Sequence, residues 1–291
     1  MLCFFAMITN LPAPHQETLA HYDHCLTEAH YSPASRKNYC AAFRQFLAHH
    51  APRPPLELAR QDILNYLTLR VAAGASATYQ NRLIDALKFY YEQVEFRQPH
   101  NIPRPKRPPP RPQVLTQSEI KALLQGTTNH KHCAMLMLAY GLGLRLGEVL
   151  ALVPADIDSK RQTLHVCGGK SRKARCLPLP TSLLSLLREQ LQEFCPVTFL
   201  FEGQQPGVPY SARSLQQVVQ QAASRVGIQR PVTLQMLRHS YATHLLEAGA
   251  DMRLLQDLMG HSSIKVTGVY ARVARKARLV SPLDGLGLKD R

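Results

Sequence analysis

Apolar residues in the first hundred positions recur at the spacing of helices. Two sets share the three- and four-residue spacing of one helix face: Tyr39, Phe43, Phe46 and Leu47, then Leu83, Leu87, Tyr90 and Tyr91. Residues three and four apart lie on the same side of an α-helix, so each set predicts an amphipathic helix with one buried face. We therefore predict that residues 15–100 form a small helical bundle.

The pattern after residue 113 mixes further helices with one short hairpin. Residues 135–150 read as a buried helix that glycines interrupt, and residues 183–194, 214–226 and 235–248 read as three more helices. Residues 163–167 and 174–179 alternate between apolar and polar positions, as the two strands of a hairpin do. The predicted fold class is mainly α, with a helical second domain at 114–291 that carries a small antiparallel sheet.

A proline-rich segment separates the two domains. Residues 101–112 contain six prolines and four basic residues, so they predict an extended basic linker, placed at 101–113. Directly after it, Thr116 and Glu119 match a capping box, and Leu115 and Ile120 are placed as a hydrophobic staple. Residues 1–14 are predicted to be a tail without signal-peptide features, and the natural start is either Met1 or Met7.

Charge and cysteine content narrow the class of function. The net charge is +15, and both halves of the chain are basic. Such a balance favours a nucleic acid partner through counterion release, or equally an anionic membrane surface. The cysteines are odd in number, scattered and without a C-x-x-C pair: Cys3, Cys25, Cys40, Cys133, Cys167, Cys176 and Cys195. We therefore expect a reducing cytoplasmic location, no disulfides and no bound metal.

The two helices of the first domain begin with polar and basic residues. These residues suit contacts with DNA phosphates: Ser32, Ser35, Arg36 and Lys37 at one helix, and Thr78, Asn81 and Arg82 at the other. The same residues also serve as ordinary solvated caps, an alternative that the sequence leaves open.

Three segments of the second domain carry the residues of a possible reaction. They are Gly141-Leu-Gly-Leu-Arg145-Leu-Gly-Glu148, then Gly168-Gly-Lys170-Ser-Arg-Lys173-Ala-Arg175, and finally Leu237-Arg238-His239 with its continuation through Gly260-His261 to Tyr270. In order and spacing, these segments resemble the tyrosine recombinase or phage integrase family, in its two-domain, Xer-like form. The resemblance implies a SAM-like, DNA-binding helical first domain and a catalytic second domain.

The resemblance also implies a role for each motif residue. Two guanidinium groups, Arg145 and Arg238, would stabilise the extra negative charge of a phosphodiester transition state, and His261 would donate to the same phosphate. Lys170 on the hairpin would protonate the leaving 5′ oxygen. Tyr270 would attack and store the bond energy as a 3′-phosphotyrosyl ester, so that neither metal, ATP nor another cofactor is needed. Glu148, three residues after Arg145, is expected to orient that guanidinium.

One position departs from the family pattern. Gln235 stands three residues before Arg238, where the family usually carries a histidine. Glutamine can hold a phosphate oxygen but cannot accept the tyrosine proton near neutral pH, so we expect a slower enzyme. His239 and His244 are interpreted as packing or supporting residues. Gln235 keeps one alternative open, a weakened, DNA-binding accessory protein. A topoisomerase of the type IB kind is a second alternative, since it shares the phosphotyrosine chemistry but needs no partner subunit.

The expected partner is a double-stranded DNA recombination site. Further contacts with its backbone are predicted for basic residues of the linker and hairpin: Arg104, Lys106, Arg107, Arg111, Lys173 and Arg175. The resemblance implies a homotetramer on two DNA sites, with the segment after Tyr270 docking on a neighbour and with accessory DNA-bending or directionality factors as possible partners. Integration, dimer resolution, cassette capture and transposon movement all remain open as the biological task.

Overall fold

The computed structural model describes residues 11–95, 102–105, 112–167, 174–261 and 263–271, with the side chains of residues 264 and 265 left aside. The chain divides into two compact units, Met1–Pro109 and Pro110–Arg291. The division lies within the predicted linker. Among the described residues, no helix is both long and apolar enough to span a membrane.

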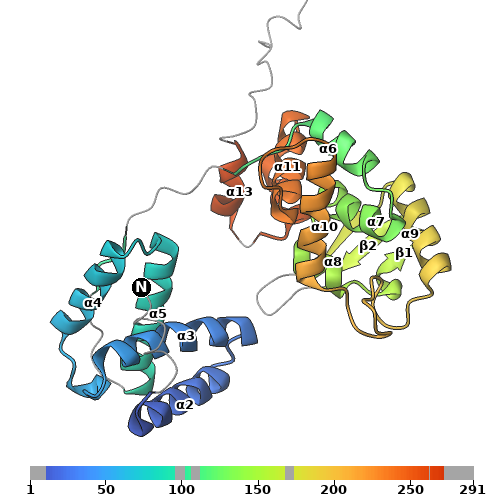
Figure 1. Cartoon of the computed structure of the whole chain (residues 1–291). Coiled ribbons are helices and arrows are strands. Elements are labelled where there is room, and N and C mark those ends of the chain that lie inside the picture. The colour runs from blue at the N-terminus through green and yellow to red at the C-terminus, as the bar shows by residue number, and fades with distance from the viewer. Residues whose placement is uncertain (1–10, 96–101, 106–111, 168–173, 262, 272–291) are drawn as a thin grey trace, which may run out of the picture. The chain divides into compact units, whose positions relative to one another are not determined.

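The first unit is helical, as predicted (Figure 1). Its elements are α2 (Ala13–Glu28), α3 (Pro33–His50), the 3-10 turn η1 (Pro55–Glu57), α4 (Arg60–Ala72), α5 (Ala77–Lys88) and the π-helical turn η2 (Phe89–Val94). The two apolar sets of the sequence lie in α3 and along α5 into η2. Helices α2 and α4 were not predicted individually, and α2 begins inside the segment predicted to be a tail.

Aromatic rings fill the core of the first unit. The Phe43 ring lies with its centre 4.5 Å from those of both Tyr22 and Tyr90. The Tyr22 side chain is fully buried, and its hydroxyl donates to the Ala86 carbonyl at 3.0 Å. This hydrogen bond satisfies the only polar group of the side chain. Helix α3 enters this core from a Ser32 cap, whose side chain accepts from the Ser35 N–H at 3.2 Å.

Part of the predicted linker belongs to the first unit. Ile102 is buried in its core, and the Arg104 guanidinium donates to the Asp85 carboxylate of α5 at 2.6 Å. Lys106, Arg107 and Arg111 lie outside the described residues. Residues 102–105 therefore pack on the helical unit, so the extended linker predicted from the sequence does not begin at residue 101.

The second unit is mostly helical with one three-stranded antiparallel sheet, as predicted. Its elements are α6 (Gln117–Gln125), α7 (His130–Gly141), α8 (Leu146–Ala151), η3 (Pro154–Asp156), β1 (Ile157–Asp158), β2 (Thr163–Val166), β3 (Arg175–Pro178), α9 (Thr181–Phe194), α10 (Ala212–Arg225), α11 (Leu234–Glu247), α12 (Met252–Met259) and α13 (Ile264–Ala271). The hairpin register pairs Leu164 with Leu177. Strand β1 and helices α12 and α13 are additions to the elements predicted from the sequence.

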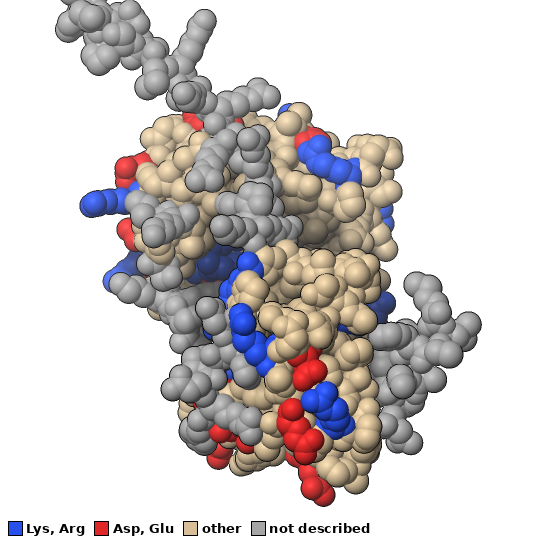
Figure 2. All heavy atoms as spheres, turned by 90° about the vertical axis from the view of Figure 1, so that its left-hand side faces the viewer, with Lys and Arg blue, Asp and Glu red and all other residues tan. Residues whose placement is uncertain are grey.

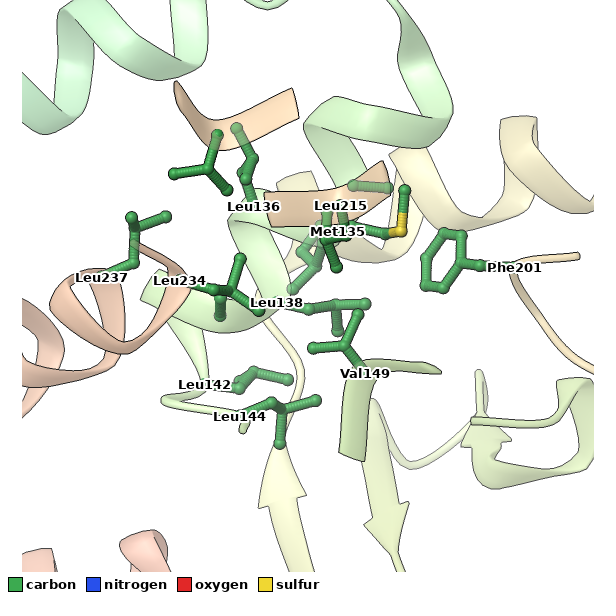
Figure 3. Packing of buried hydrophobic residues seen from close by; sticks show 14 of the residues in the cluster. Met135, Leu136, Leu138, Leu142, Leu144, Val149, Phe201, Leu215, Leu234 and Leu237 are labelled. Atoms are coloured by element: carbon green, nitrogen blue, oxygen red, sulfur yellow. The ribbon is translucent and has the colours of Figure 1, made fainter. Parts of the chain in front are cut away.

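Helix α7 is the centre of the second unit. Met135, Leu136 and Leu138 of this helix are fully buried, and Figure 3 shows them surrounded by Val149 of α8, Leu215 of α10 and Leu234 and Leu237 of α11. Helices α8 and α11 carry predicted catalytic residues. Their packing on α7 therefore holds Arg145 and Arg238 against one rigid element.

The start of the second unit is capped as the sequence predicted. The Thr116 side chain accepts from the Glu119 N–H at 3.2 Å, and the Glu119 carboxylate accepts from the Thr116 N–H at 2.7 Å. Leu115 and Ile120 are both buried in the core of this unit. The capping box and the hydrophobic staple thus tie the chain to the catalytic unit from residue 115 onward.

Candidate active site

Glu148 holds two of the predicted catalytic arginines. Arg145 is the N-cap residue of α8, and Glu148 accepts its backbone N–H at 2.8 Å and its guanidinium at 2.9 Å. The same carboxylate lies 3.7 Å from the guanidinium of Arg238 on α11. The role in orienting Arg145 that the sequence suggested for Glu148 agrees with this geometry, and the carboxylate also reaches the second arginine.

Arg175 is a third arginine of this cluster. Its guanidinium donates to both carboxylate oxygens of Glu148, at 2.9 and 3.1 Å, and its Nε donates to the Leu258 carbonyl at 2.9 Å. A Cβ on Gly260 would come within 3.1 Å of this guanidinium, and Gly260 has a φ of +60°. The side chain is only 8% exposed. In this structure Arg175 therefore positions Glu148, and its predicted contact with DNA stays a prediction.

The cluster carries three positive charges against one negative charge. Burial alone would raise the pKa of Glu148, but hydrogen bonds from Arg175 and Arg145 outweigh it and hold the pKa at about 2. Burial, followed by repulsion from Arg145, lowers the pKa of Arg238 to about 10, so it too stays charged at neutral pH. This excess of positive charge favours binding of an anion such as a phosphate.

Arg238 joins the three sequence segments physically. It is 1% exposed, and its guanidinium donates to the carbonyl of Gly143, before α8, and to that of Met259, at the end of α12, the latter at 2.7 Å. A third contact, at 3.1 Å, reaches Nε2 of His261. These bonds explain why segments 95 and 21 residues away along the chain meet at this residue.

His261 is neutral in this arrangement. A guanidinium can only donate, so Nε2 of His261 accepts from Arg238, and the ring proton lies on Nδ1, which is 3.0 Å from the Thr267 hydroxyl. Burial, with repulsion from Arg238 and Arg145, lowers the pKa of His261 to about 4. In this state His261 supports Arg238, and donation to a phosphate through Nε2 requires a change of protonation or tautomer.

Tyr270 lies at the same site, on α13. Its hydroxyl is 3.0 Å from Nδ1 of His239, and its ring stacks on that of His261 with centres 6.3 Å apart. Burial raises the pKa of Tyr270, while Arg238 and Arg145 oppose that rise. The structure thus brings together four residues that the sequence singled out separately: Arg145, Arg238, His261 and Tyr270.

His239 is a site residue whose contact with Tyr270 sequence reasoning did not predict. We interpreted it only as a packing or supporting residue, and it lies against the Tyr270 hydroxyl. Its Nε2 lies 3.4 Å from the Gln235 side chain, one helical turn earlier on α11. The four-residue spacing of Gln235 and His239 was the available signal, since residues so spaced share a helix face. His244 instead lies 3.0 Å from the hydroxyl of Tyr140 on α7, a packing contact.

The remaining predicted residues fall into two groups. Lys170 and Lys173 lie outside the described residues. In the first unit, the Arg36 guanidinium forms an ion pair with Asp23 at 2.6 Å, Lys37 lines the neighbouring groove of about 800 Å³, and Thr78 is exposed on α5 beside the half-buried Asn81 and Arg82. Figure 2 shows Lys and Arg side chains at several places on one face, with Asp and Glu beside some of them.

Over the described part of the chain, no group of three or more His, Cys, Asp or Glu residues is placed to hold a metal ion.

Buried arginines beside a tyrosine, on a mainly helical unit preceded by a helical bundle, define the class of the tyrosine recombinases. Residues 113–277 match the phage integrase family, and residues 19–101 match the SAM-like N-terminal domain of phage integrases. The chain belongs to the phage integrase family and is a tyrosine-type site-specific recombinase.

Individual relatives agree with this assignment. The tyrosine recombinase XerA of Pyrococcus furiosus is 32% identical, over 82% of this chain and 85% of its own. A crystal structure of XerA recombinase covers 88% of this chain and 92% of its own, with 29% identity and a TM-score of 0.51. A lambda integrase tetramer bound to a Holliday junction covers 97% of this chain and 82% of its own, with a TM-score of 0.72; at 18% identity it shows the fold alone.

Proposed function

We propose that this recombinase cuts one DNA strand with Tyr270 and rejoins it through a 3′-phosphotyrosyl ester. The observation that supports this proposal most strongly is that one cluster contains Arg145, Arg238, His261 and Tyr270. The Tyr270 oxygen forms a bond to phosphorus while the bond to the 5′ oxygen breaks, and Lys170 supplies a proton to that oxygen. The ester keeps the bond energy, so rejoining needs neither ATP nor a metal.

The phosphate would enter as an acceptor for the buried guanidinium groups. Arg238 is 1% and Tyr270 is 3% exposed, so a DNA phosphate reaches them only when this part of the site opens. A phosphate oxygen would then replace Nε2 of His261 as the acceptor for Arg238. The negative charge favours a protonated His261, which can donate to the same phosphate as the family resemblance implies.

The proposed partner is a double-stranded recombination site to which both units bind. The helix starts of the first unit, with Ser32, Ser35, Arg36, Lys37, Thr78, Asn81 and Arg82, and the linker residues would contact phosphates. The proposal includes a homotetramer on two sites in the cytoplasm, with accessory DNA-bending or directionality factors as candidate partners. In support of the tetramer, the lambda integrase neighbour is a tetramer on a Holliday junction. The relatives lend no support to a topoisomerase.

Covalent capture tests the proposal. Adducts between the wild-type protein and genomic DNA fragments would identify a site, which is then built into a nicked suicide substrate that traps the cleaved strand. We expect an adduct that accumulates with the wild type and is absent with Tyr270→Phe, at equal DNA affinity.

Two results would contradict this. An undiminished adduct in Tyr270→Phe would mean that another residue is the nucleophile. Tight and specific DNA binding without any adduct would favour the accessory protein, for which Gln235 is the supporting feature.

A further inference from the structure

The Tyr270 hydroxyl needs a proton acceptor, and the position usually filled by histidine holds Gln235. Among the described side chains, His239 is the basic group in hydrogen-bond contact with that hydroxyl, at 3.0 Å through Nδ1. Both ring nitrogens of His261 are engaged elsewhere, with Arg238 and with Thr267. Arginine remains protonated and cannot act as a base.

We propose that His239 is the general base that takes the Tyr270 proton during strand cleavage, and that Gln235 orients the His239 ring for this task. This inference rests on the proposed phosphotyrosyl function. The Tyr270 O–H bond breaks as the O–P bond forms, and the proton moves to Nδ1 of His239. In rejoining, the 5′ hydroxyl gives its proton back to Lys170 as it attacks phosphorus, the bond from phosphorus to the tyrosine oxygen breaks, and the imidazolium of His239 returns its proton to that oxygen.

The hydrogen bonds that the Gln235 amide can form define its role beside His239. An amide nitrogen can only donate, so with its NH2 group toward His239, Gln235 holds Nε2 as an acceptor and leaves the proton on Nδ1, where it points at Tyr270. Rotating the amide by half a turn presents the carbonyl oxygen instead. Nε2–H then donates to Gln235, and Nδ1 is free to accept from the Tyr270 hydroxyl. By rotating its amide, Gln235 therefore stabilises either tautomer of His239, including the reactive one, without taking a proton itself.

The surroundings keep His239 in its basic, neutral form. In the described part of the unit, the charged or titratable groups next to it are Arg238 on its own helix and Tyr270 on α13, and His261 stacks on the Tyr270 ring. Burial, followed by repulsion from Arg238, lowers the pKa of His239 below its ordinary value. An imidazolium cannot accept a proton, so the cleavage rate should rise with pH as His239 deprotonates and level off toward neutral pH.

The experiment compares His239→Asn with the same substitution at a matched histidine of the same helix. Asparagine retains a polar atom near the place of Nδ1 but cannot take a proton. His244→Asn is the control, since His244 is also half-buried on α11 and makes the same 3.0 Å contact with a tyrosine hydroxyl, that of Tyr140. We expect His239→Asn to form the suicide-substrate adduct roughly 10²- to 10⁴-fold more slowly at unchanged DNA affinity. His244→Asn should stay within about threefold of the wild type, because its contact lies outside the reaction.

Two further measurements separate a base from a structural residue. The rise of cleavage rate with pH should disappear in His239→Asn, and in Gln235→Glu it should shift to higher pH, because a carboxylate raises the pKa of the adjacent imidazole. A substrate with sulfur in place of the bridging 5′ oxygen should rescue Lys170→Ala but not His239→Asn, since a thiolate needs no proton to leave.

The outcomes are distinct. Wild-type rates in His239→Asn, or slower cleavage with an unchanged rise with pH in both His239→Asn and Gln235→Glu, would overturn the assignment of His239 while leaving the proposed function in place. Rescue of His239→Asn by the sulfur substrate would assign it to the leaving group instead. If the wild type forms no Tyr270-dependent adduct at all, the proposed function fails and this inference fails with it.

Discussion

Glu148 is the residue on which the positions of three arginines depend. Its carboxylate pairs with Arg145 and Arg175 at 2.9 Å and with Arg238 at 3.7 Å, and its side chain is 9% exposed. Removing one member of a buried ion network leaves the other charges without compensation, which costs more than the network contributes when intact. Without the Glu148 carboxylate, the three guanidinium groups at this site would repel one another with no negative charge between them.

We therefore expect Glu148→Gln to lower the free energy of unfolding of the second unit by about 3–5 kcal/mol at neutral pH, measured by urea denaturation. The folded-state pKa of about 2 lies below the usual 4.5, so this stabilisation is full above pH 4.5 and is lost as the pH falls toward 2. The gap between variant and wild type should narrow over that range. Glu189→Gln, on an exposed face of α9, is the control and should change stability by less than about 0.5 kcal/mol. An equally small effect of Glu148→Gln would contradict this account.

At the scale of elements, the break between α7 and α8 creates the site. Gly143 adopts a φ of +62°, which a side chain disfavours, and its carbonyl accepts from Arg238. A Cβ at Gly143 would lie 2.4 Å from the ring of Tyr241 on α11. The turn thus allows α11 to approach closely enough for Arg238 to reach the start of α8.

Gly143→Ala should accordingly destabilise the second unit by about 1–3 kcal/mol and also slow cleavage, because the ring and the carbonyl that holds Arg238 must shift. Thermal unfolding and the suicide-substrate assay measure the two effects. Gly141→Ala is the matched control: it ends α7 with ordinary φ, and its added Cβ would meet no atom within 4 Å. It should change stability by less than about 1 kcal/mol. Equal effects of the two changes would show that backbone freedom at Gly143 is unimportant.

At the scale of the whole molecule, the net charge of +15 is distributed over both units. Some of that charge is already compensated internally, as in the ion pairs Arg36–Asp23 and Arg104–Asp85. Arginines held in this way offer a phosphate less than free ones do, since the existing ion pair must first be broken. The number of basic residues therefore overstates the number of DNA contacts.

Binding to a cognate duplex should weaken with salt by roughly 0.9 log unit per log unit of salt for each phosphate contact. Replacing Lys106, Arg107 or Arg111 with Gln should each reduce that slope by roughly 0.9, whereas Arg104→Gln should change it less because Arg104 is paired with Asp85. Fluorescence anisotropy across a salt series measures the slopes. An affinity that does not change with salt would show that phosphate contacts do not hold the complex together.

The sequence by itself determined the mainly helical class of both units, helices such as α3, α5, α9, α10 and α11, the hairpin, the cap at Thr116 and the family, but not α2, α4, α12 or α13. These features depend on local periodicity and on motifs of residues close together in the chain, so they can be recognised from the sequence alone. Only the tertiary structure decided that Arg175 turns inward to Glu148, 27 residues away, and that His239 contacts Tyr270, 31 residues away. Such contacts depend on how closely β3, α8, α11 and α13 approach one another, and that approach is set by packing around α7 and by the turn at Gly143. Side-chain direction at a site follows from this packing, which hydrophobic periodicity does not encode.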